Sequence, residues 1–228
     1  MRYPVITADP PVPFKVWSKK TKPGTGNRSA EDHYSTMDWQ DLNDLAPFVQ
    51  SVAADDCCLF LWICQPLLLE TLDMAKAWGF EYKTKAFSWC KTYHSGGFFV
   101  GMGYWTRANT EDVLLFTRGN PKRVHKDVRQ LLASLYEKPY SVPGVVAPMT
   151  RHSEKPEAVQ DGVERLVKGP YLELFARRQR PNWTCVGNEV DGLDIRDSLT
   201  RLANDEQLPV VEAVDTGQRS LFDLDEAA

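Results

Sequence analysis

The segment Tyr3-Pro4-Val5-Ile6-Thr7-Ala8 runs directly into Asp9-Pro10-Pro11-Val12. The first six residues are mostly apolar or β-branched, which predicts a short strand. The two prolines that follow fix φ near about −65° and remove backbone donors, so the turn offers acceptors rather than N–H groups. The Asp9 carboxylate and the Pro10 carbonyl could together accept both hydrogens of an exocyclic amine. An ordinary proline turn that ends a strand is the alternative interpretation.

Predicted strands and helices alternate along the rest of the chain. The run CCLFLWIC at 57–64 is continuously apolar, which is typical of a strand covered on both faces. Further strands are predicted at 83–91, 112–117, 171–176 and 184–190, and helices at 38–52, 65–78, 157–167 and 195–202. This alternation predicts an α/β fold with a mainly parallel sheet and helices on both faces.

Three connections are polar and too long for tight turns: 15–33, 92–110 and 118–150. The first is basic and contains Gly and Pro. The third opens with a set of basic residues: Arg118, Lys122, Arg123, His125, Lys126 and Arg129. We expect the first connection to lie beside the Asp9 turn and the other two to flank the same sheet edge. Basic side chains of the first and third could then hold phosphates.

The composition suits one large domain with an appendage. The 228 residues are 43% hydrophobic, and we place the domain at 1–203 and a flexible acidic tail at 204–228. The net charge of −4 is concentrated in the tail, because residues 201–228 hold Arg201 and Arg219 against seven acids. The remainder is nearly neutral, so the overall charge does not exclude a nucleic-acid partner.

The cysteines and histidines predict neither disulfides nor a metal site. The five cysteines have no paired ligand spacing and lie mostly in apolar runs, as buried thiols of a reducing compartment do. The four histidines show no ligand spacing either. With no secretory leader and no apolar stretch of about 18 residues, we expect a cytoplasmic protein without a membrane span.

A series of motifs then follows the order and approximate spacing of one known family. They are Asp9-Pro10-Pro11, HYSTM at 33–37, LFLW at 59–62, WGF at 78–80, SWCK at 88–91, GYWTRANTE at 103–111, HSEKP at 152–156, ELFAR at 173–177, and Trp183 with GNE at 187–189. The chain thus resembles the adenine-N6 methyltransferases, which include the catalytic subunit of the eukaryotic mRNA adenosine methyltransferase and many bacterial and phage DNA enzymes. The resemblance implies a Rossmann-like fold that uses S-adenosylmethionine, with the catalytic motif preceding the cofactor strand. It also favours a bacterial or phage source.

The resemblance implies three groups of site residues. The catalytic turn comprises Asp9, Pro10 and Pro11. The residues that match cofactor contacts are Asp9, Lys155 for the methionine carboxylate, Asn188 and Glu189 for the ribose hydroxyls, and Glu173, Phe175 and Arg177 at the cofactor strand. The residues that match the substrate pocket are Val12, Tyr34, Trp89 and Lys91.

Several of these residues also have purely structural interpretations. Lys155 could be a solvated lysine, Glu173 a charge at the end of a sheet, and Trp89 part of the core. Three polar residues before the strand at 112–117 fit a pocket rim and structural salt bridges equally well: Arg107, Asn109 and Glu111. The segment between Arg177 and Trp183 is shorter than in some relatives, so we assign no role to Gln179 or Arg180.

One departure from the family bears on substrate binding. An aromatic residue usually follows Asp-Pro-Pro and stacks on the target base, but this chain has Val12. Base-aromatic stacking is worth about 1–3 kcal/mol, so base capture is weakened unless another ring compensates. Phe14, Trp17 and Tyr34 are candidates for that ring. An inactive relative that only binds nucleic acid is the alternative interpretation.

These observations favour methyl transfer to the N6 amine of adenine in DNA. The chemistry needs alignment and fixed charges but no covalent nucleophile on the enzyme. An adenine in a duplex must first leave the base stack. The alternatives are an RNA adenine-N6 methyltransferase, a non-catalytic nucleic-acid-binding relative and a small-molecule methyltransferase. The sequence predicts no oligomeric state.

The tail contains a further motif. Gln218-Arg219-Ser220-Leu221-Phe222 closely resembles the peptide by which many bacterial proteins dock onto the replication sliding clamp. Gln218 would supply amide hydrogen bonds, while Leu221 and Phe222 would supply an apolar anchor. Alternatively, Leu221 and Phe222 pack on their own domain.

Overall fold

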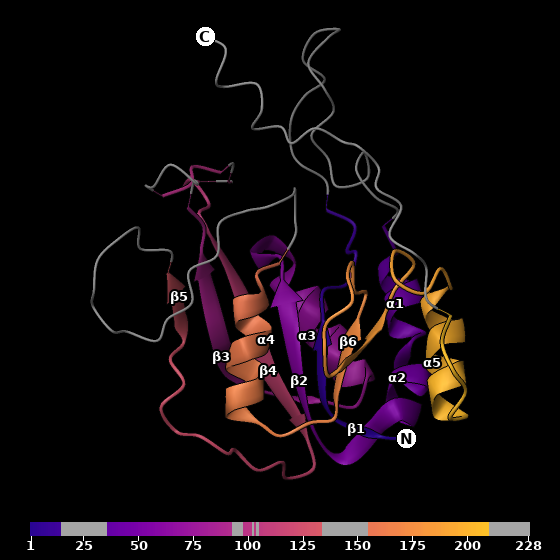
Figure 1. The fold of residues 1–228 in the computed structure, drawn as a ribbon. Coiled ribbons are helices and arrows are strands. Elements are labelled where there is room, and N and C mark those ends of the chain that lie inside the picture. Colours follow the sequence, from indigo (N-terminus) through magenta and orange to yellow (C-terminus); the bar gives the residue numbers. More distant parts are fainter. Residues whose placement is uncertain (15–35, 93–97, 102, 104, 134–154, 210–228) are drawn as a thin grey trace, which may run out of the picture.

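A seven-stranded sheet forms the centre of the molecule in the computed structural model, which describes residues 1–14, 36–92, 98–101, 103, 105–133 and 155–209 (Figure 1). The strand order is β5-β3-β4-β2-β1-β6-β7. The strands are β1 (Tyr3–Ala8), β2 (Ala53–Ile63), β3 (Glu81–Cys90), β4 (Thr110–Arg118), β5 (Leu131–Ala133), β6 (Tyr171–Leu174) and β7 (Trp183–Val186).

The sheet is mainly parallel, as predicted. β1 pairs in parallel with β2 and β6, β6 with β7, and β3 with β5. Only β4 runs the other way, between β2 and β3. The carboxyl ends of β1, β2, β3 and β6 therefore meet at one edge, where β4 begins. This edge lies at the top in Figure 1 and is called the upper edge; the opposite one is the lower edge.

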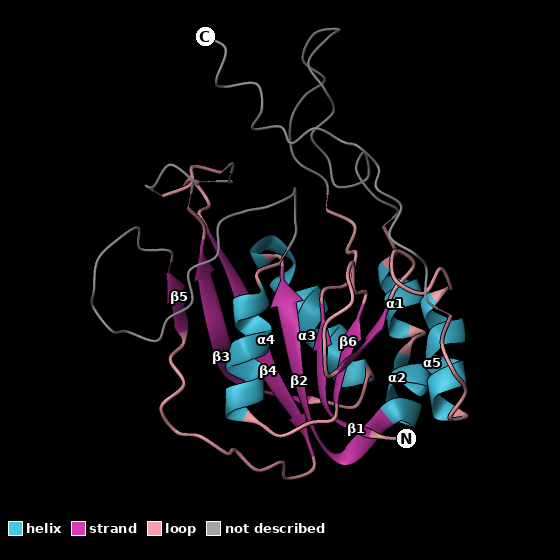
Figure 2. Cartoon of the chain, in the orientation of Figure 1, coloured by secondary structure: helices cyan, strands magenta, loops and turns pink. Residues whose placement is uncertain are grey.

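Helices cover both faces of the sheet, which confirms the predicted fold class. One face carries α1 (Trp39–Asn43), α2 (Ala46–Val52), α3 (Leu68–Ala77) and α5 (Ile195–Ala203), and the other carries α4 (Glu157–Leu166) (Figure 2). Alternate residues of β1 enter two different cores: Ile6 packs with the four-helix face, and Val5 packs with α4. Burial on both faces explains the unbroken apolar run in β2.

Four predicted elements differ in detail, and the first is the strand expected at 184–190, because β7 ends at Val186. The helix expected at 38–52 is divided into α1 and α2, and Pro47 lies in the first turn of α2. Proline lacks the N–H that a helix interior needs but is accepted in a first turn, so it marks a new start. The segment 65–78 opens with a 3-10 turn at Gln65–Leu67 before α3. β2 starts at Ala53, four residues before the predicted strand.

The expectation that the third long connection flanks the Asp9 edge is wrong for its first part. Because β4 is antiparallel to β2, Arg118 ends at the lower edge. The Val124 N–H donates to the Leu166 carbonyl at 2.8 Å, at the last residue of α4, and Arg165 pairs with Asp127 at 2.8 Å. The basic residues of 118–129 thus begin at the edge opposite Asp9. The short β5 in this connection was not predicted.

The predicted domain boundary at 203 coincides with the end of α5 and stays a prediction. Leu208, beyond that helix, is partly buried against the core. The rest of the predicted tail, 210–228, and its clamp-like motif lie outside the described residues. No helix of the described part is long and apolar enough to cross a membrane.

Candidate active site

The Asp-Pro-Pro turn leaves β1 at the upper edge. Residues 10–12 contain a single backbone N–H, that of Val12, and it donates to the Pro10 carbonyl at 2.8 Å. The Met37 N–H donates to the Pro11 carbonyl at 2.9 Å, which ties the turn to the start of α1. A carbonyl oxygen has two lone pairs, so Pro10 keeps one acceptor position beside the Asp9 carboxylate. The predicted pair of amine acceptors is therefore compatible with the turn.

Asp9 belongs to a chain of four alternating charges. The Lys155 Nζ lies 3.0 Å from Asp9 Oδ2 and 3.4 Å from Glu111 Oε2, and the Lys91 Nζ contacts Glu111 Oε1. The four side chains come from different segments: the end of β1, the residue before Pro156 and α4, the start of β4 and the end of β3. We call them the Asp9 network. The sheet order brings them together, although they are up to 146 residues apart in the chain.

Burial and mutual attraction set the charges of this network. Burial raises the pKa of Asp9, and the Lys155 ammonium offsets part of that rise. Burial opposes ionisation of Glu111 as well, but the ammonium groups of Lys155 and Lys91 outweigh it, so the pKa of Glu111 is lowered. The Asp9 and Glu111 carboxylates likewise outweigh burial at Lys155 and raise its pKa. The Lys155 ammonium is therefore charged at neutral pH.

Two tryptophans lie beneath the lysines. The Lys155 Nζ is 5.2 Å from the ring centroid of Trp62, and the Lys91 Nζ is 5.2 Å from that of Trp89. Such contacts favour an ammonium over the ring face. Trp89 was predicted as a substrate contact with a core alternative, and its 2% exposure fits the core. It contacts the Asp9 network at Lys91.

The predicted cofactor residues meet beside the Asp9 turn. β6 pairs with β1 so that Leu174 lies opposite Ala8, and Phe175 to Arg177 therefore emerge next to Asp9. Arg177 Nε donates to Glu189 Oε1 at 2.8 Å, which joins this segment to the turn after β7. A Cβ on Gly187 would lie 2.4 Å from the Ala176 carbonyl oxygen, so glycine permits this approach. Asn188 is exposed in the same turn.

Phe175 has a left-handed backbone, with φ of 59°. A bulky residue in this region is uncommon and occurs mainly where the surrounding structure imposes it, often at functional sites. Here the neighbouring Ala176 N–H donates to the Val186 carbonyl at 2.9 Å. The bend holds the chain across the end of β6, at the predicted cofactor position.

Glu173 is partly buried and is held by a side chain of α4. Gln160 Nε2 on α4 donates to both of its carboxylate oxygens, at 3.1 and 3.2 Å. Burial raises the pKa of Glu173, and the Gln160 hydrogen bonds only partly offset this. Its predicted contact with the cofactor stays a prediction. Gln160 was missed in the sequence because a polar residue within a helix has no distinctive pattern.

The remaining predictions have different outcomes. Glu111, which fitted two interpretations equally, lies at the centre of the Asp9 network. Arg180, for which the sequence predicts no role, pairs with Asp161 at 2.6 Å and Glu164 at 3.0 Å on α4 and is structural. Val12 is partly buried against the core. Tyr34 and Trp17 lie outside the described residues. Among the described residues, Phe14 is the candidate for a ring that replaces the missing aromatic at position 12.

The donor set fits S-adenosylmethionine. Such a cofactor presents an ammonium, a carboxylate and a ribose diol. The site offers the Asp9 carboxylate, the Lys155 ammonium and the exposed turn of Asn188 and Glu189 at one sheet edge. Ligands of open α/β sheets bind outside the carboxyl ends of the strands. The described part contains no group of three or more His, Cys, Asp or Glu that could hold a metal ion.

Comparison with known proteins agrees with this geometry. The model of the MT-A70 family matches residues 3–189, from the first strand to the turn after β7. The chain belongs to the MT-A70 family. The match includes Asp9, Lys155 and Glu189 and therefore spans the whole candidate site.

Three curated relatives are all methyltransferases by name, and two of the names state adenosine or adenine. The chain is 34% identical over 203 residues to the type II methyltransferase M.MunI of a Mycoplasma species, covering 83% of this chain and 78% of that protein. It is 28% identical over 151 residues to the human N(6)-adenosine-methyltransferase catalytic subunit METTL3, covering 64% of this chain and 24% of that one. It is 26% identical over 198 residues to the human N(6)-adenine-specific methyltransferase METTL4, covering 82% and 37%.

Proposed function

We propose that this MT-A70 methyltransferase transfers a methyl group from S-adenosylmethionine to the N6 amine of adenine in DNA. The observation that carries the proposal is the Asp9 turn, where the Asp9 carboxylate and the remaining acceptor position of the Pro10 carbonyl stand at the upper edge. The similarity to M.MunI, which extends over most of both chains, favours DNA.

The chain's residues position and neutralise the reactants. S-adenosylmethionine supplies an electrophilic methyl group on a sulfonium. Asp9 and the Pro10 carbonyl accept the two N6 hydrogens and direct the nitrogen lone pair toward that methyl carbon. The cofactor would supply the methyl group and keep the electron pair of the broken C–S bond on its sulfur, which becomes a neutral thioether. The surplus proton on N6 passes to Asp9 and then to solvent. Such a step is accelerated mainly by alignment and fixed charges.

Lys155 links the two halves of the site. Its ammonium pairs with Asp9 and Glu111, and it would hold the methionine carboxylate of the cofactor. Asn188 and Glu189 would hold the ribose hydroxyls, while Phe175 and Arg177 form the wall beside them. Lys91 would face the substrate side of the network. These roles are predictions that are geometrically compatible with the fold.

The test is methyl transfer from labelled S-adenosylmethionine to matched DNA and RNA oligonucleotides that contain the same adenines. We expect incorporation into DNA at a rate at least about tenfold above that into RNA. RNA as the preferred acceptor would support the second candidate, which the similarity to METTL3 favours. No transfer to either, despite nucleic-acid binding, would support a non-catalytic relative.

We also propose that the tail motif of Gln218, Leu221 and Phe222 docks onto a bacterial sliding clamp. Docking would raise the effective concentration of the enzyme near DNA, although the acidic tail itself repels phosphates. A peptide covering 216–225 should bind a clamp at micromolar strength, and the double variant L221A/F222A should not. Loss of domain stability in that variant would instead indicate packing of the tail on its own domain.

A further inference from the structure

The connection between β3 and β4 presents a tryptophan that methyl transfer does not use. Trp105 is 98% exposed, and Phe98 and Val100 of the same connection are also exposed. A tryptophan buries a large apolar area when it is covered, so one left fully in water at the tip of a connection marks a contact with something else. The described part of this connection rises above the upper edge (Figure 1).

Three backbone hydrogen bonds join described parts of this connection. The Lys91 N–H donates to the Asn109 carbonyl at 2.8 Å, the Phe99 N–H to the Lys91 carbonyl at 3.0 Å, and the Gly101 N–H to the Ala108 carbonyl at 3.0 Å. A Cβ on Gly103 would lie 2.0 Å from the Thr106 carbonyl oxygen, so only glycine fits there. This close approach of Gly103 to Thr106 constrains the described backbone on both sides of Trp105.

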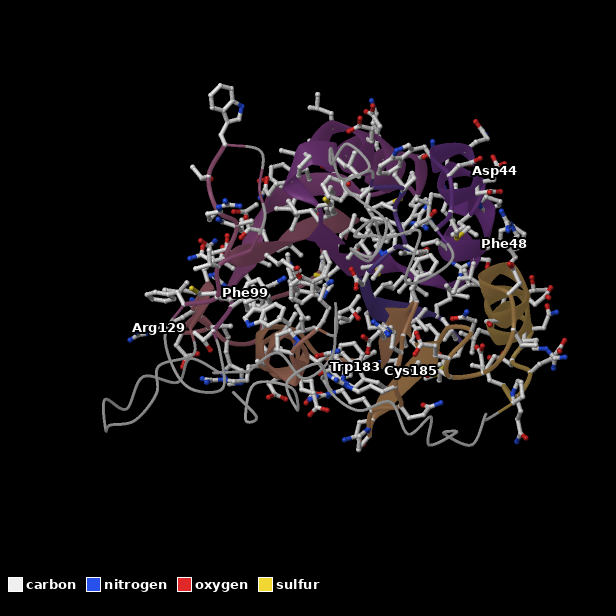
Figure 3. All side chains as sticks on the ribbon, turned by 90° about the horizontal axis from the view of Figure 1, so that it is seen from above. Asp44, Phe48, Phe99, Arg129, Trp183 and Cys185 are labelled. Atoms are coloured by element: carbon white, nitrogen blue, oxygen red, sulfur yellow. The ribbon has the colours of Figure 1, made fainter. Side chains whose placement is uncertain are left out.

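The base of the connection between β3 and β4, which we call the hairpin, is joined to the catalytic turn. Lys91, at its first pair, contacts Glu111, and Glu111 reaches Asp9 through Lys155. Trp105 lies four positions before Asn109, and these four steps span at most about 14 Å. This reach is similar to the width of the DNA major groove, about 12 Å. Viewed onto the upper edge, Phe99 of the hairpin lies on the same side as Arg129, at the β5 end of the sheet (Figure 3).

The size of the surface favours a nucleic acid over a second protein chain. A stable protein interface buries about 800 Å² on each partner, which three side chains of a narrow hairpin do not supply. A single ring is enough to enter a base stack, where base-aromatic stacking is worth about 1–3 kcal/mol. The exposed Arg107, two residues further on, is placed to contact a phosphate.

We propose that Trp105 enters the base stack of duplex DNA and fills the space that the target adenine leaves when it moves to Asp9. This rests on the proposed function. Moving a base out of a duplex costs about a few kcal/mol, and an inserted apolar side chain offsets part of that cost. Trp105 therefore promotes methylation of duplex DNA, whereas a single strand has no base stack for it to fill.

The test compares Trp105→Ala and Trp105→Phe with the wild-type chain on two substrates: a duplex and a single strand with the same target adenine. Trp105→Ala should lower kcat/KM on the duplex about tenfold to hundredfold, as expected when one stacking interaction is removed. It should leave the single strand within about twofold, and Trp105→Phe should restore most of the duplex rate. Val124→Ala, an exposed apolar residue at the lower edge, is the matched control and should change neither.

A binding measurement keeps the proposal testable without catalysis. Wild-type protein should bind a duplex with an abasic site more tightly than an intact one, because the vacancy already exists, and Trp105→Ala should lose this preference. Equal loss on duplex and single strand, or no preference for the abasic duplex, would overturn the proposal. So would a wild-type dimer that Trp105→Ala converts to monomers, which would assign the hairpin to a protein interface. Absence of methyl transfer with the abasic preference intact would overturn only the proposed function.

Discussion

The two edges of the sheet carry cationic side chains in very different surroundings. At the upper edge, the side chain of Lys155 is only 15% exposed and lies between two carboxylates above Trp62. At the lower edge, Arg165 and Asp127 form a pair whose side chains are 46% and 66% exposed. An exposed ion pair contributes about 0–1 kcal/mol to the free energy of unfolding, whereas removing one partner of a buried pair lowers it by about 3–5 kcal/mol. Position relative to the carboxyl ends of the strands, rather than the number of basic residues, distinguishes the functional charges.

The largest expected effect comes from the upper edge. Asp9→Ala should lower methyl transfer at least about 100-fold while cofactor binding stays detectable, because a single transition-state interaction can be worth about 10² or more in rate. Asp127→Ala removes a carboxylate at the lower edge and should retain activity within about twofold. Initial rates with labelled cofactor, together with equilibrium binding of the cofactor, make the measurement. Equal losses in both variants would remove the distinction between the edges.

Lys155→Met should weaken cofactor binding and change the pH profile. The Lys155 ammonium counteracts the burial that raises the pKa of Asp9, so its loss raises that pKa further. Since Asp9 acts in its ionised form, the acidic limb of the rate profile should move to higher pH. Lys126→Met, at an exposed position of the lower-edge connection, is the matched control. If the acidic limb of the rate profile is unchanged in Lys155→Met, ionisation of Asp9 does not set the pH dependence of methyl transfer.

The partly buried carboxyl of Glu173 should affect the pH dependence of the free energy of unfolding. Because its pKa is raised in the folded chain, the folded chain binds that proton more tightly than the unfolded chain. The resulting contribution is fully present below the ordinary carboxyl pKa and is lost as pH rises through the raised value. Glu173→Gln should therefore flatten the fall in unfolding free energy above pH 4.5, measured by chemical denaturation across a pH series. The exposed Glu81→Gln should leave the slope as in the wild type.

The smallest effect should come from the lower edge. The triple variant K122A/R123A/K126A removes three exposed cations that the sequence pattern alone places beside Asp9. Their observed position predicts that the affinity for a short duplex and its salt dependence change little. Each phosphate that a cation neutralises adds about one unit to the slope of affinity against salt concentration. A slope lowered by about two units or more would show that DNA extends along this edge.

Local patterns in the sequence predicted most of the fold, and long-range pairing accounts for what they missed. The apolar run of β2 and the period of α4 are properties of neighbouring residues, so both elements were predicted. The direction of β4 depends on strands that are distant in sequence, and its reversal is what sends 118–129 to the lower edge. A strand of three residues such as β5 is too short for a periodic pattern.

The candidate site shows the same division. Asp9 was found because two prolines beside a carboxylate make a distinctive turn, and Lys155, Asn188 and Glu189 were found through the family resemblance. Glu111 acquires its place only when β4 brings it within reach of Lys155 and Lys91. The surroundings of Glu173 depend on Gln160 of α4, which donates a hydrogen bond to its carboxylate. Burial and partners of this kind are not encoded in spacing.

The central claim is that the Asp9 turn holds the N6 amine of adenine for methylation. The most direct measurement is mass spectrometric identification of the methylated nucleoside after wild-type protein acts on duplex DNA with isotopically labelled S-adenosylmethionine. The label should appear in N6-methyladenine alone, and Asp9→Ala should yield about one hundredth as much or less. Label in methylated cytosine, or undiminished N6-methyladenine from Asp9→Ala, would contradict the claim.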